Sequence, residues 1–84
     1  MRIYVKTLSA GLGPGEVVVE VETASGSTEQ VIMHSDDILE EDTGETIEVG
    51  YPIHSSKNKS LVELPSESIS GRWRVWVPSS VEIA

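Results

Sequence analysis

The densest group of chemically reactive side chains in this sequence is a run of carboxylates between positions 36 and 48. It holds seven of the chain's fourteen acidic residues and is interrupted by no lysine or arginine. Carboxylates at such short spacing can act as general acids and bases, ligate calcium, or attract a basic partner. The acidic run consists of Asp36, Asp37, Glu40, Glu41, Asp42, Glu45 and Glu48.

Three interpretations of the acidic run stay open. It can be a solvated loop and short helix that keep a small protein soluble. It can be a docking surface for a basic partner, including a partner whose groove normally holds nucleic-acid phosphates. It can be a calcium site, but Glu40, Asp42 and Gly44 match only a fragment of an EF-hand loop. We predict partner docking, with no catalytic residue, no metal and no cofactor.

The two histidines, His34 and His54, do not complete a recognisable site. Zinc needs a third or fourth ligand, and the chain has no cysteine to supply one. His34, Ser35 and Asp36 are the residue types of a hydrolase triad, but as direct neighbours in sequence their side chains diverge. The glycine-rich segment at 11–15 lacks the spacing of a phosphate-binding loop. We therefore predict that the protein is not an enzyme.

A second candidate interaction surface involves the tryptophans near the C-terminal end. Trp73 and Trp76 are three residues apart, so on a strand they face opposite sides. Trp73 shares its side with Val75 and Val77 and is predicted to lie in the core, which leaves Trp76 outside. An exposed tryptophan beside arginines is typical of an interface hot spot. The predicted patch consists of Arg2, Tyr4, Arg72, Arg74 and Trp76.

The same residues allow another arrangement of this patch. Trp76 can pack on Tyr4 of a neighbouring strand, with an arginine stacked on it by a cation–π contact. The sequence does not decide whether Trp76 is exposed or packed.

The elements that must position these residues follow from an alternation of polar and apolar side chains, which predicts strands. Glycine- and serine-rich turns separate the strands at 11–15, 24–27 and 55–59. A short helical turn is predicted at 35–42, with Ser35 as its N-cap. The predicted strands are 2–8, 16–22, 30–34, 46–54, 61–64 and 72–77, with one more edge pairing at 81–83.

These elements predict one all-β domain over residues 1–84. The short connections favour an antiparallel meander that closes into a barrel or a curled sheet of SH3-like size. In the first hairpin, Arg2 or Lys6 is expected opposite Glu20 or Glu22. The predicted core consists of Ile3, Val5, Val17, Val19, Val21, Val31, Met33, Ile47, Val49, Ile53, Trp73, Val75 and Val77.

The composition narrows the functional classes. The net charge of -8 argues against direct binding of nucleic acid or of an anionic membrane surface. No apolar segment approaches the roughly 20 residues that span a bilayer, so we expect a soluble, cytoplasmic protein. We predict a non-enzymatic protein–protein interaction domain, an accessory factor such as an inhibitor or stabilising subunit, including viral ones, with a basic partner. The alternatives are a structural subunit that builds a homo-oligomer or shell through strand edges, and an acidic mimic of nucleic acid.

Overall fold

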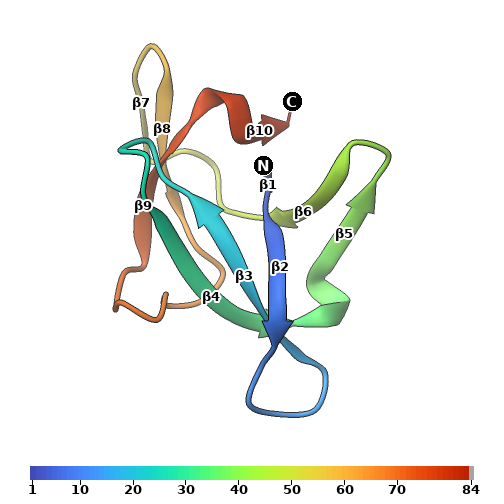
Figure 1. Ribbon diagram of the computed structural model, residues 1–84. Coiled ribbons are helices and arrows are strands. Elements are labelled where there is room, and N and C mark those ends of the chain that lie inside the picture. Colours follow the sequence, from blue (N-terminus) through green and yellow to red (C-terminus); the bar gives the residue numbers. More distant parts are fainter. Residues whose placement is uncertain (84) are drawn as a thin grey trace.

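The structure, a computed structural model, describes residues 1–83 and consists of short strands with two single 3₁₀ turns. Figure 1 shows the strands and the connections between them. The all-β class predicted from the alternating sequence is confirmed. The strands are β1 (Arg2–Tyr4), β2 (Lys6–Ala10), β3 (Glu16–Glu22), β4 (Thr28–His34), β5 (Ile38–Glu41), β6 (Gly44–Glu48), β7 (His54–Ser55), β8 (Lys59–Glu63), β9 (Arg74–Pro78) and β10 (Glu82–Ile83), and the turns are η1 (Ser35–Asp37) and η2 (Ser79–Val81).

The strands of residues 1–83 form three small antiparallel sheets, with strand orders β10-β1-β6-β5, β2-β3-β4 and β7-β8-β9. Two of them are meanders of consecutive strands, as predicted. In the third, β1 lies between β6 and β10, which come much later in the chain. No sheet closes on itself in the described part of the chain, so the predicted barrel is not confirmed.

The junction between two of these sheets lies at Val5. β1 and β2 follow one continuous path, drawn in blue in Figure 1. The Val5 N–H donates to the Glu45 carbonyl at 3.0 Å, which extends the β1–β6 pairing by one residue. From Lys6 onward the chain pairs with β3 instead, and Lys6 lies opposite Glu20, one of the predicted cross-strand pairs.

The β3–β4 hairpin is the most regular unit and contributes much of the core. Its register runs without a shift from Glu16 opposite His34 to Glu22 opposite Thr28. The tip turns at Gly26, whose φ of 86° is a conformation that glycine adopts without steric cost. The alternation in β3 and β4 buries one side of the hairpin. The buried core consists of Ile3, Val19, Val21, Val31, Met33, Ile47, Val49, Val62, Leu64, Val75, Val77 and Val81, and Val5 and Val17 pack against it partly exposed.

Two residues of the predicted core are exposed. Ile53 is 48% exposed because β6 ends at Glu48 and the chain then crosses between sheets, which breaks the predicted 46–54 strand. Trp73 is 53% exposed because β9 begins only at Arg74, so the alternation of that strand does not extend to Trp73. Both errors have the same cause: a period of two carries no information beyond the end of its strand.

The helical prediction for 35–42 is correct only for its first residues. The 3₁₀ turn η1 ends at Asp37, and Ile38 begins β5, where it lies opposite Ile47 of β6. The N-cap is His34, whose Nδ1 accepts from the Asp36 N–H at 3.2 Å, and not the predicted Ser35. Pairing with β6 thus overrides the local helical signal of the carboxylates.

Candidate functional site: a groove beside Trp76

The carboxylates of the acidic run do not share one face. In the β5–β6 hairpin, Glu40 lies opposite Glu45 and Glu41 lies opposite Gly44. Successive strand residues point to opposite faces, so Glu40 and Glu45 lie on one face of the hairpin and Glu41 on the other. The prediction that the acidic run forms one contiguous negative surface is therefore wrong.

Glu45 has a structural partner. Its two carboxylate oxygens accept from the Thr7 N–H at 3.1 Å and from the Thr7 hydroxyl at 3.0 Å. These bonds join β6 to β2 just after the backbone pairing between the two segments ends at Val5. Glu45 therefore holds two sheets together and is not free to bind a partner.

Three more acids of the run lie close to a basic side chain, a histidine ring or the N-terminus. Glu41 forms an ion pair with Arg2, Glu48 lies 3.7 Å from the N-terminal amine, and Asp36 lies 3.5 Å from His34. The remaining acids have no ion-pair partner within residues 1–83 and are exposed. They are Asp37, Glu40 and Asp42.

Tyr4 and Arg2 are not brought to Trp76. The Tyr4 hydroxyl forms a hydrogen bond with the Thr43 hydroxyl at the β5–β6 turn. Gly44 lies under the Tyr4 ring, where an added Cβ would stand 3.6 Å from it. The predicted five-residue patch is therefore divided between β1, which carries Arg2 and Tyr4, and the segment at 72–76, and Trp76 does not pack on Tyr4.

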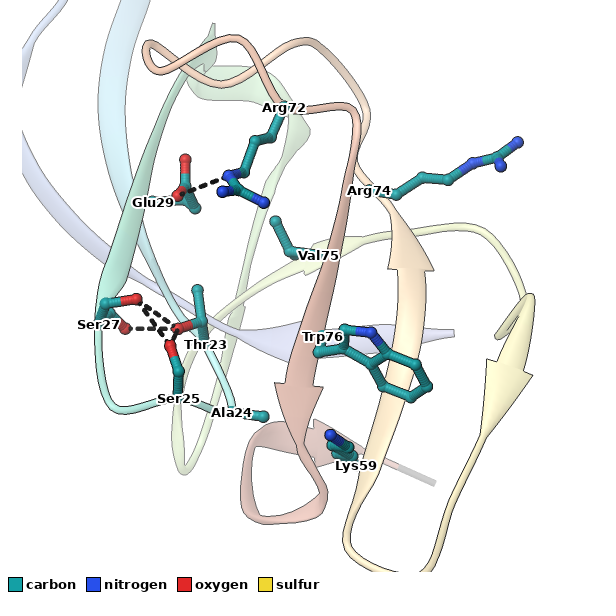
Figure 2. A pocket seen from close by; sticks show the side chains of 10 residues that line it. All are labelled: Thr23, Ala24, Ser25, Ser27, Glu29, Lys59, Arg72, Arg74, Val75 and Trp76. Atoms are coloured by element: carbon teal, nitrogen blue, oxygen red, sulfur yellow. Dashed lines mark hydrogen bonds and ion pairs between the residues drawn. The ribbon is translucent and has the colours of Figure 1, made fainter.

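The other three members of that patch line one groove, shown from close by in Figure 2. The groove lies between β9 and the tip of the β3–β4 hairpin and has a volume of about 300 Å³. It gathers three of the chain's six basic residues, one tryptophan and three hydroxyl groups. Its lining residues are Thr23, Ala24, Ser25, Ser27, Glu29, Lys59, Arg72, Arg74, Val75 and Trp76.

Trp76 is half-buried and held in place at the edge of the groove. The Lys59 ammonium lies 4.8 Å from the centre of the indole ring, a cation–π contact. The His54 ring meets the indole edge-on, with ring centres 5.7 Å apart. The expected cation–π contact is therefore present, but a lysine of β8 makes it and not an arginine. These contacts fix the indole without covering it completely.

Arg72 is placed by a carboxylate at the floor of the groove. Glu29, whose side chain is only 13% exposed, lies 3.7 Å from the Arg72 Nε. Glu29 also accepts from the hydroxyls of Ser70 at 2.5 Å and Ser68 at 2.8 Å. These two hydrogen bonds, and then the charge of Arg72, lower the pKa of Glu29 below its ordinary value, against the opposing effect of burial. Glu29 is thus an ionised anchor for Arg72.

The hydroxyl groups of the opposite wall form a cluster. The Thr23 and Ser27 hydroxyls lie 2.7 Å apart, and each lies 3.0 Å from the Ser25 hydroxyl. The hairpin that carries them is fixed to β9, because the Ala24 N–H donates to the Trp76 carbonyl at 2.8 Å. This wall therefore presents groups that can donate to an acceptor in the groove.

Sequence reasoning found Arg72, Arg74 and Trp76 but missed Lys59, Glu29 and the hydroxyl cluster. No local sequence feature marks Glu29 or the hydroxyl cluster, since both reach the groove only through contacts between segments distant in the chain. The alternation of the 59–63 segment gives the one usable signal, because it places Lys59 on the same side of its strand as Leu61, which lies opposite Trp76.

No known protein family, curated protein or solved structure matches this chain. Within residues 1–83, no three histidine or acidic side chains lie close enough together to hold a metal ion. No helix of the described residues is long and apolar enough to cross a membrane.

Proposed function

We propose that this protein is a non-enzymatic interaction domain, an accessory factor of the cytoplasm, that binds a partner protein at the Trp76 groove. The observation that carries the proposal is a half-exposed tryptophan, fixed by Lys59 and His54, at the edge of a groove that also contains Arg72 and Arg74. Tryptophan and arginine in a partly enclosed site are the residues that most often dominate binding energy at interfaces.

The acidic run supports partner binding less well. Glu45 is bound to Thr7 and Glu41 to Arg2, so those carboxylates are not available to a basic partner. The unpaired acids Asp37, Glu40 and Asp42 offer a smaller surface. A mimic of nucleic acid needs a continuous row of charges, and the two faces of the β5–β6 hairpin divide that row.

The chain contains its own control for a test of this proposal. Trp73 is also exposed and lies three residues from Trp76, but it does not line the groove. We expect Trp76→Ala to reduce capture of the partner from a lysate of the native host at least tenfold, and Trp73→Ala to leave capture unchanged. Thermal unfolding of both variants checks that the fold is kept. Equal capture by wild type and Trp76→Ala would contradict the proposal.

A further inference from the structure

The inner edge of β9 has free backbone groups where it borders the groove. β9 is the last strand of its sheet and pairs on one side with β8. On that side the Leu64 N–H donates to the Trp73 carbonyl. The carbonyls of Leu61 and Glu63, which lie opposite Trp76 and Arg74, accept instead from Ile53 and Gly50 on the far side of β8.

Arg74 and Trp76 are therefore non-hydrogen-bonded positions of the β8–β9 ladder, and their backbone groups point away from β8. The Ala24 N–H takes up the Trp76 carbonyl at one end of the groove, and the Ser68 N–H takes up the Arg72 carbonyl at the other. Between these two positions, the Arg74 N–H and carbonyl and the Trp76 N–H point away from β8, the one strand of the described residues that pairs with β9, and make no other backbone hydrogen bond within residues 1–83. An extended strand presents such groups to a second strand.

The side chains around this free edge favour a negatively charged ligand. Glu29 is occupied by two hydroxyls and by the Nε of Arg72. Arg74 reaches Glu63 through its Nε at 3.3 Å, which leaves its terminal nitrogens unpaired by that contact. Lys59 takes part in no ion pair of the described residues. The groove thus has spare cationic donors in a protein whose net charge is -8.

We infer that the groove binds a short, extended, acidic segment of the partner protein, which hydrogen bonds to β9 at Arg74 and Trp76 and places carboxylates at Arg72 and Lys59. The inference rests on the proposed function and names its ligand. Strand addition of this kind takes affinity from main-chain hydrogen bonds and specificity from the side chains beside the edge. Here the bases select acidic residues, whose side chains alternate along the added strand and so share one face of it.

A synthetic peptide tests the charge requirement. The probe is acetyl-Glu-Val-Glu-Val-Glu-amide, and its control is the same peptide with glutamine in place of each glutamate. In ¹H–¹⁵N spectra we expect the first peptide to shift the amide signals of Arg74 and Trp76 and the Trp76 indole signal. The glutamine peptide should bind at least tenfold more weakly, because hydrogen bonds between charged groups are the stronger ones. Equal binding of both peptides would overturn the inference.

Two further arms test the geometry. Peptides N-methylated at alternate residues, in either register, remove main-chain donors without altering charge, and one of the two should lose binding. Unchanged binding of both would show that no strand is added.

Lys59→Gln should weaken binding severalfold, whereas Lys57→Gln, in the same β7–β8 hairpin but outside the groove, should not. Equal effects of the two substitutions would contradict the site.

The outcomes separate this inference from the function on which it rests. If neither peptide binds at millimolar concentration while capture of the native partner still depends on Trp76, the acidic-strand inference fails and the interaction domain stands. Preferential binding of a single-stranded oligonucleotide, or of the β5–β6 hairpin of a second copy, would also overturn the inference.

Discussion

Glu29 links Arg72 to the hydroxyls of Ser68 and Ser70 in the groove. It accepts from Ser70 and Ser68 and lies beside Arg72, so it is favoured in its ionised form in the folded protein. Its folded pKa lies below the ordinary value of 4.5. A depressed acidic pKa contributes stability that is present above the unfolded pKa and lost as the pH falls through the folded pKa.

Glu29→Gln should therefore lower the free energy of unfolding at pH 7 by roughly 1.5–3 kcal/mol, the usual range for hydrogen bonds to a charged group. The difference from wild type should shrink as the pH falls below about 4.5, the ordinary pKa of a glutamate. Urea unfolding at pH 7 and pH 3 measures both effects. Glu67→Gln, an exposed substitution in the loop that carries Ser68 and Ser70, should be neutral at either pH. A pH-independent loss for Glu29→Gln would show that its charge is not involved.

For single residues, the sequence correctly predicted Trp76 on the outer face of its strand and wrongly predicted Trp73 in the core. Trp76 lies inside β9, where the period of two assigns it to the outer face with Arg74. Trp73 precedes the strand, at a bend where the period does not hold. The contacts of Trp76 with Lys59 and His54 depend on the register of β7, β8 and β9, which the residues of β9 alone do not encode.

In the β5–β6 hairpin, Glu45 was predicted to bind a partner but instead links β6 to β2. Glu45 bonds Thr7 twice, whereas Glu40, directly opposite on the same face, has no such partner among residues 1–83. We expect Glu45→Ala to lower the free energy of unfolding by about 1–3 kcal/mol. Glu40→Ala should be neutral or slightly stabilising, because it removes a like charge opposite Glu45. Chemical unfolding of the two variants compares them directly, and equal stabilities would mean that the link to β2 contributes nothing.

Elements were predictable where local and tertiary signals agree. The 16–22 strand has the predicted bounds, and the hairpin tip at 24–27 is where the serines and Gly26 indicated it. The short helical turn predicted near 35–42 is present only at 35–37, because Ile38 gains more by pairing with Ile47 than the acidic start gains by continuing the helix. The 46–54 strand failed because its alternation continues in sequence after the sheet has ended at Glu48.

For the whole molecule, the sheet that contains β1 could not be derived from sequence. β1 pairs with β6 and β10, and no turn residue or spacing specifies contacts between segments so distant. The Trp76 groove depends on the same kind of contact, since the β3–β4 hairpin meets β9 through the Ala24–Trp76 hydrogen bond. Local alternation gives the faces of the strands, whereas the site arises where two sheets meet.

The exposed edge of β5 bears on whether copies of this chain associate. β5 is the last strand of its sheet, and exposed Leu39 and acidic Glu40 lie on it. Charges on an edge strand oppose pairing between copies, and the net charge of -8 adds long-range repulsion. We therefore expect a monomer of 9.1 kDa by light scattering at millimolar protein and physiological salt. Glu40→Val should cause association that grows with concentration, whereas Glu22→Val, on the central strand of another sheet, should not. A wild-type oligomer at micromolar concentration would instead favour the alternative function of a structural subunit. Copies would then pair despite the negative charges on this edge.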